Sequence, residues 1–158
     1  MRKSPAQAYA LTSGALLVLA GIAGFFYSAD FSTGAAAADP GNRDALVGVF
    51  DVNGWDNVLH VLTGLAALGA AGSWIAARRY SFTFGTIYLI LAGVGFALGD
   101  GHAILGLFVV NTADNILHVA IAALGLVAAL LSPSAPRPTL EGERSLAFEP
   151  SIRPGTVS

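Results

Sequence analysis

Four long apolar runs divide the sequence, and they constrain the fold more than any other feature. The runs cover residues 9–27, 58–77, 82–98 and 116–131, and none of them contains a proline. Each holds about 16 to 20 residues, close to the ~20 with which a helix crosses the ~30 Å hydrocarbon core of a bilayer. In lipid, an open chain satisfies its backbone hydrogen bonds only as a helix. The runs therefore predict an all-α bundle of four transmembrane helices.

The composition agrees with a membrane protein. The chain is 54% hydrophobic and only 11% charged, whereas soluble domains carry about 25% charged residues. Because the chain has no cysteine, disulfides, thiolate zinc sites and cysteine nucleophiles are excluded. No basic cluster indicates nucleic acid. The expected partner is the lipid bilayer, together with a membrane protein or a second copy of the chain.

Charge predicts the orientation of the helices. Seven of the eight basic residues lie near the amino terminus, between the second and third runs, or after the fourth run, and all seven aspartates lie on the other side. The positive-inside rule then places both termini in the cytoplasm. A signal peptide is the alternative interpretation of the first run. It is disfavoured because the run is long and the small residues at 35–38 lie far beyond it.

The segment after the fourth run differs from the rest. Residues 132–158 hold five prolines and mixed charges, a composition typical of disorder. The sequence thus predicts a membrane domain at 1–131 and a disordered cytoplasmic tail at 132–158.

A doubled motif indicates an internal repeat. Segments 45–61 and 103–119 are identical at ten of 17 positions, including the polar pattern Asn-x-x-Asp-Asn-x-x-His. Residues 17–21 and 89–93 match weakly as well. The sequence predicts two tandem, parallel helix-pair repeats, at about 9–77 and 82–131. Such copies would be related by a pseudo-two-fold axis along the membrane normal, as in some transporters.

A short apolar segment precedes each motif. Residues 45–50 and 103–110 are too short to cross a bilayer. An interfacial turn of helix is the preferred interpretation, and a re-entrant segment buried in protein is the alternative.

Each motif is suited to the start of a helix. Its first Asn can cap the helix, and the Asp three residues later can return a bond to the backbone of the cap. The Asp and the His are four residues apart, and the second Asn is three before the His, so they share one helix face. The candidate site residues are Asn53, Asp56, Asn57, His60, Asn111, Asp114, Asn115 and His118.

Several interpretations of this polar face stay open. In the structural one, each His pairs with its Asp and an Asn, and the two copies lock the second and fourth helices together. In the second, His60, His118, Asp56 and Asp114 bind a divalent metal, or the two histidines bind haem b. In the third, the cluster lines a path for a solute or proton. No catalytic signature is present. The prediction is therefore a non-enzymatic structural or accessory protein without a cofactor, with metal or haem binding and transport as alternatives.

Two smaller features also carry predictions. His102 follows Gly99-Asp100-Gly101 and is expected in a loop, with a third metal ligand as the alternative. Gly95-x-x-x-Gly99 and Ala20-x-x-x-Gly24 allow close helix approach, either between the first and third helices or at a dimer face.

The motifs also resemble a known family. The doubled pattern Gly-x-Phe-x-Val-Asn-x-x-Asp-Asn-x-Leu-His-Val, followed by a helix rich in Ala, Gly and Leu, resembles small bacterial four-helix membrane proteins known as domain of unknown function 4383. The second copy, residues 110–118, is the nearest to the pattern. The similarity runs from about residue 9 to residue 131. It implies a multi-pass protein of the bacterial plasma membrane and adds no activity.

Overall fold

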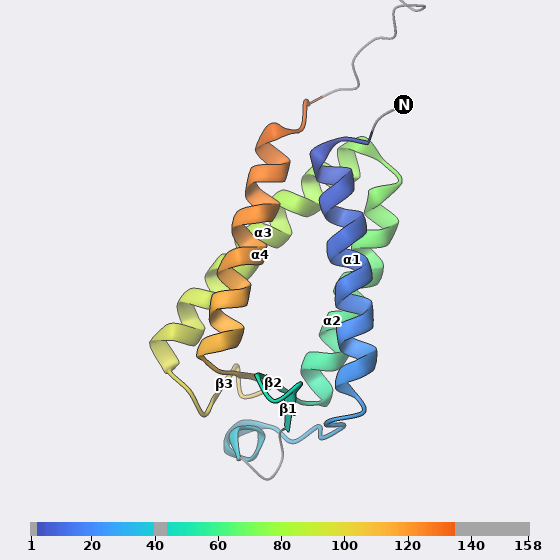
Figure 1. Cartoon of the computed structure of the whole chain (residues 1–158). Helices are drawn as coiled ribbons and strands as arrows, with labels where there is room; N and C mark the ends of the chain where they lie inside the picture. The colour runs from blue at the N-terminus through green and yellow to red at the C-terminus, as the bar shows by residue number, and fades with distance from the viewer. Residues whose placement is uncertain (1–2, 40–43, 135–158) are drawn as a thin grey trace, which may run out of the picture.

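Four α-helices dominate the computed structural model, which describes residues 3–39 and 44–134. The helices are α1 (Pro5–Gly24), α2 (Gly54–Ala71), α3 (Trp74–Leu98) and α4 (Thr112–Leu131). Helix α1 packs along α2, and α3 packs along α4 (Figure 1). The predicted helical class is confirmed. Most of the predicted tail, residues 135–158, lies outside the described residues.

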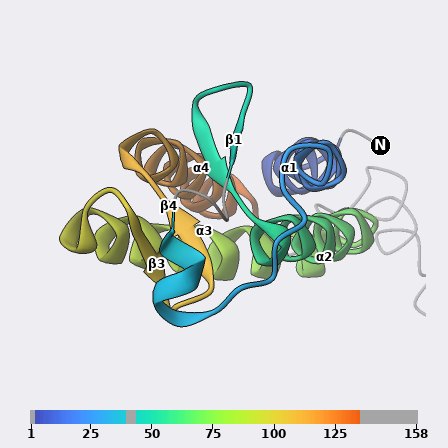
Figure 2. The same ribbon diagram turned by 90° about the horizontal axis from the view of Figure 1, so that it is seen from below.

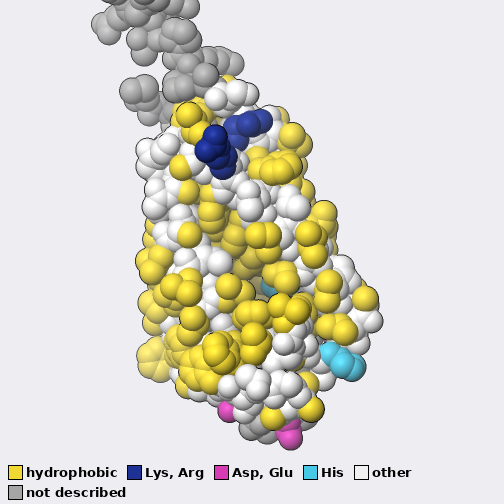
Figure 3. Space-filling view, turned by 180° about the vertical axis from the view of Figure 1, so that it is seen from behind, with side chains coloured by type: hydrophobic (Ala, Val, Ile, Leu, Met, Phe, Trp, Pro, Cys, Tyr) yellow, Lys and Arg dark blue, Asp and Glu magenta, His cyan; other side chains and the backbone are white. Residues whose placement is uncertain are grey.

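Three of the four helices, α1, α3 and α4, are long and apolar enough to cross a membrane. Large apolar side chains are exposed on every helix, among them Leu19, Leu62, Ile90 and Leu124. Figure 3 shows apolar side chains over most of one face, with basic side chains at one end and acidic ones at the other. A surface of this kind is compatible with lipid, since lipid does not require polar side chains on the outside of a bundle.

The boundary between α2 and α3 lies earlier than the sequence indicated. The apolar run at 58–77 predicted one helix, but α2 begins at Gly54 and ends at Ala71, and α3 begins at Trp74. Gly72 ends the first helix, and the Ser73 side chain caps the second by accepting from the Ala76 amide at 3.4 Å. Arg78 and Arg79, which the sequence placed between the second and third apolar runs, therefore lie within α3.

The short apolar segments before the motifs form β-hairpins. Strands β1 (Asp44–Leu46) and β2 (Phe50–Val52) pair antiparallel, as do β3 (His102–Ile104) and β4 (Phe108–Val110). The predicted interfacial helix is therefore wrong. The reason lies in the turns, where Val47, Gly48, Leu105 and Gly106 all have positive φ. Two successive residues with positive φ suit a tight hairpin and break a helix.

The hairpins lie at one end of the molecule, and the start of α1 and the end of α4 lie at the other (Figure 1). Both hairpins and the short 3₁₀ helix η1 (Gly34–Ala38) gather across one end of the helices (Figures 1 and 2). At the other end, the Ala6 amide donates to Ser132 Oγ at 2.9 Å, joining the start of α1 to the end of α4. The core between the helix pairs includes Leu17, Phe84 and Tyr88.

Candidate functional site

The first Asn of each motif caps the helix that follows. The Asn53 side-chain oxygen accepts from the Asp56 amide at 3.0 Å, and Asn111 accepts from the Asp114 amide at 3.0 Å. Both residues have extended backbone, as an amino-terminal cap requires. The predicted caps of α2 and α4 are confirmed.

The same two Asn side chains reach the opposite hairpin. Asn53 Nδ2 donates to the Leu107 carbonyl at 2.7 Å, and Asn111 Nδ2 donates to the Val49 carbonyl at 2.8 Å. Leu107 immediately precedes β4, and Val49 immediately precedes β2. Each amide therefore bonds with its oxygen to its own helix and with its nitrogen to the other half of the chain.

The motif aspartates also cross to the opposite hairpin. Asp56 Oδ2 accepts from the Val109 amide at 3.1 Å, and Asp114 Oδ2 accepts from the Asp51 amide at 3.1 Å. Asp114 Oδ2 accepts from the Asn111 amide as well, at 3.0 Å, which completes a capping box in the second copy. In the first copy, the carboxylate of Asp56 accepts from the opposite hairpin, and only the bond from the Asp56 amide to the Asn53 side chain caps the helix. Each acid thus supplies an acceptor to a strand amide of the other half.

The predicted Asp–His pairing within each motif is not present. Among the described residues, neither histidine forms a hydrogen bond with the Asp four residues earlier, because both carboxylates are directed to backbone amides. The Nδ1 atoms of His60 and His118 are buried and have no hydrogen-bond partner in the part of the chain that the structure describes. The ring of His118 packs edge-on against Tyr88, with the centroids 4.8 Å apart.

The second Asn of each motif is buried against a glycine of the adjacent helix. Asn57 and Asn115 are almost completely buried, and Asn57 Nδ2 donates to the Ser28 carbonyl at 2.8 Å. Their Oδ1 atoms have no hydrogen-bond partner among residues 3–39 and 44–134, and they occupy the space that a Cβ would fill at Gly24 and at Gly95. A Cα–H of each glycine therefore faces an amide oxygen, a weak contact that only a residue without a side chain permits.

This contact also corrects the prediction for the small residues. Gly24 lies against α2 and Gly95 against α4, so they join the members of each helix pair and do not join α1 to α3. Gly99 ends α3 with positive φ, and no atom lies close to the position of a Cβ there. Nothing in the sequence linked these glycines to Asn57 and Asn115, although the two copies share the arrangement.

The four-ligand metal site is not assembled. Within residues 3–39 and 44–134, no group of three or more His, Asp or Glu side chains is placed to hold a metal ion. His102 is the first residue of β3, exposed, with Nδ1 3.3 Å from the Gly99 carbonyl oxygen. The third-ligand alternative for His102 is therefore contradicted. Haem binding by His60 and His118 stays a prediction.

A protein family matches nearly the whole of the folded part of the chain. Residues 7–131 match the family described as Domain of unknown function (DUF4383). The chain belongs to this family. The match to DUF4383 covers both hairpins and all four helices except the first two residues of α1, and it ends at the last residue of α4. It confirms the resemblance that the motifs indicated. No curated protein and no solved structure matches the chain.

Proposed function

We propose that this DUF4383 protein is a non-enzymatic, four-span protein of the bacterial plasma membrane with a structural or accessory role. The observation that carries the proposal is the use of the motif's polar groups. The amides of Asn53 and Asn111 and the carboxylates of Asp56 and Asp114 are all bonded to backbone groups. Groups used in this way hold the protein together and are not free for substrate chemistry.

Equivalent contacts in the two halves support a tandem repeat. Val49 and Leu107 are 58 residues apart in the sequence, as are Asp51 and Val109, so the bonds that each motif makes to the opposite hairpin correspond. This exchange is what a pseudo-two-fold axis along the membrane normal would produce.

The helices support the same axis. Tyr9 Oη donates to the Ile121 carbonyl at 3.1 Å, and Tyr80 Oη donates to the Thr63 carbonyl at 3.2 Å. Tyr9 of α1 thus corresponds to Tyr80 of α3. Tyr9 and Tyr80 are 71 residues apart (80 − 9), whereas the sequence comparison of 17–21 with 89–93 indicated an offset of 72 (89 − 17).

The distribution of charge supports both termini in the cytoplasm. Lys3, Arg78 and Arg79 lie at the end that holds the start of α1 and the end of α4, whereas the aspartates belong to the hairpin end. Under the positive-inside rule, the hairpins then lie at the outer surface. Helix α2 also crosses the membrane in this arrangement. Its 18 residues extend about 27 Å at 1.5 Å per residue, nearly the thickness of the hydrocarbon core.

Single-cysteine labelling tests this topology directly, because the natural chain has no cysteine. We expect Thr33→Cys to react with a membrane-impermeant maleimide in intact spheroplasts. Gly72→Cys and Ser158→Cys should react only after the membrane is opened. Thr33 and Gly72 are both exposed, and Gly72 has an ordinary helical backbone, so neither change should disturb the fold.

Gly72→Cys decides whether α2 crosses the membrane. Labelling of Gly72→Cys from outside, together with Thr33→Cys, would show that α2 stays on the outer side and would overturn the four-span arrangement. Labelling of Ser158→Cys alone from outside would instead contradict the cytoplasmic placement of the carboxyl terminus.

A further inference from the structure

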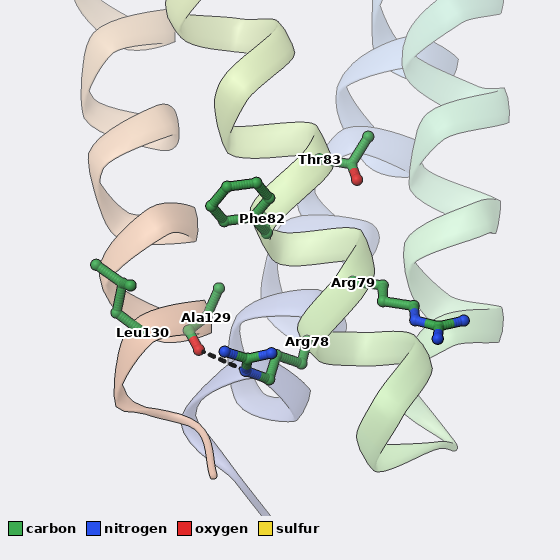
Figure 4. A pocket seen from close by; sticks show the side chains of 6 residues that line it. All are labelled: Arg78, Arg79, Phe82, Thr83, Ala129 and Leu130. Carbon is green, nitrogen blue, oxygen red and sulfur yellow. Dashed lines mark hydrogen bonds between the residues drawn. The ribbon is translucent and has the colours of Figure 1, made fainter. Parts of the chain in front are cut away.

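A groove lies between α3 and α4 at the end of the molecule that holds the start of α1 and the end of α4. Its volume is about 310 Å³. The groove follows one face of α3, and the last turn of α4 forms a wall (Figure 4). It is lined by Arg78, Arg79, Phe82, Thr83, Ala129 and Leu130.

Two arginines place positive charge in the groove. Arg78 Nε donates to the carbonyls of Ala129 and Ser132, both at 3.1 Å, which fixes its guanidinium beside the end of α4. Figure 4 shows Arg79 directed to the opposite side of α3. No acidic residue lines the groove in the described part of the chain. Arg78 thus lines the groove on the side of α4 and Arg79 lines it on the side away from α4, and both add positive charge to it (Figure 4).

The surface beside the arginines is apolar. Phe82 is 55% exposed and Leu130 is 72% exposed, and both line the groove. Trp74 lies one turn before Arg78, and its indole nitrogen donates to the Pro133 carbonyl at 2.7 Å. Trp is the residue that membrane proteins favour at the level of the lipid headgroups. In a bilayer, the arginines would thus lie near the lipid headgroups, and the apolar side chains of the groove would face the acyl chains.

We propose that the groove binds the phosphate of an anionic phospholipid from the cytoplasmic leaflet, with an acyl chain along Phe82 and Leu130. Guanidinium groups bind phosphate through paired hydrogen bonds. Basic pockets between membrane helices on the cytoplasmic side are suited to anionic headgroups. The exposed apolar residues favour a lipid over a free phosphate, because a free phosphate has no apolar group that could pack against them. This inference rests on the membrane placement proposed above, and it does not depend on the role of the polar motif.

Native mass spectrometry of the full chain in detergent tests the inference. Phosphatidylglycerol is added to the protein, with phosphatidylcholine and inorganic phosphate as separate probes. We expect phosphatidylglycerol to bind more tightly than either. A basic residue near an anionic lipid contributes about fivefold in affinity. Arg78→Gln/Arg79→Gln should therefore weaken phosphatidylglycerol binding about 25-fold. Arg79→Gln alone should weaken it about fivefold. Lys3→Gln removes one positive charge from the same end of the molecule, outside the groove lining, and should leave binding nearly unchanged.

Each contrary result is distinct. Equal binding of phosphatidylcholine would overturn the requirement for an anionic headgroup, and equal binding of inorganic phosphate would overturn the lipid. A loss in Lys3→Gln equal to that in Arg79→Gln would show general charge attraction and no groove. Arg79→Gln alone preserves the Arg78 bonds to α4, so it tests the groove even if Arg78→Gln fails to fold. Absence of the protein from the membrane fraction would refute the proposed function instead.

Discussion

An alanine at Gly24 or at Gly95 is expected to lower the free energy of unfolding by about 1–3 kcal/mol, the usual cost of overfilling a packed interior. At both positions a Cβ would overlap the side-chain oxygen of a buried Asn, Asn57 or Asn115. The Asn cannot simply move away, because it is almost completely buried, and Asn57 is also bonded to the Ser28 carbonyl. Thermal unfolding of each purified variant in detergent measures the loss.

Gly93 provides a matched control on the same helix as Gly95. No atom lies within 4 Å of a Cβ built at Gly93, so Gly93→Ala should be neutral or should stabilise α3 by up to about 1 kcal/mol. Adding Asn115→Ala to Gly95→Ala removes the overlapping oxygen. The double variant should then lose less stability than the sum of the two single changes. Equal effects of Gly93→Ala and Gly95→Ala would refute the proposed overlap.

The second large effect is expected at the motif aspartates. Asp56→Ala and Asp114→Ala should each cost about 1–3 kcal/mol, because each leaves a strand amide of the opposite hairpin without its acceptor. Asp114→Ala should cost more, because Asp114 accepts from two amides, those of Asp51 and Asn111. Replacement of either Asp by Asn keeps an acceptor oxygen and should cost less than alanine.

Hydrogen exchange can localise this effect. Exchange at the Val109 amide should rise in Asp56→Ala, and exchange at the Asp51 amide should rise in Asp114→Ala. Asp44→Ala is the control, because Asp44 is exposed and bonds to its neighbour Ala45. If Asp56→Ala melts at the same temperature as Asp44→Ala, the bond to Val109 contributes nothing to stability.

The parts of the site that could be predicted from the sequence are local. The Asn caps of α2 and α4 were predictable because a cap joins residues three apart in one helix turn. The hairpins were not, because residues 45–50 and 103–110 are short apolar segments whose periodicity does not separate strand from helix. The turn is set by positive φ at Val47 and Leu105, a conformation that β-branched and bulky residues rarely adopt.

The long-range contacts were beyond such patterns. The bonds from Asn53 to Leu107 and from Asp56 to Val109 depend on how the two halves meet, and no local spacing encodes that. The helical start of α3 was missed because the residues on both sides of Gly72-Ser73 are equally apolar, so hydropathy alone shows no break.

The reciprocal bonds also impose an order on biosynthesis. When the first helix pair has entered the membrane, Asn53 and Asp56 have capped or started α2, but their partners at Leu107 and Val109 have not yet been made. In the full chain these groups are buried and bonded to the second hairpin, and a buried polar group that lacks its partner is costly. A chain that stops at residue 73 would therefore present unsatisfied amide and carboxylate groups at the start of α2. We expect pulse-chase labelling to show faster degradation of that fragment than of the full chain. Completion of the second hairpin would thus be the step at which the nascent protein becomes resistant to membrane proteases.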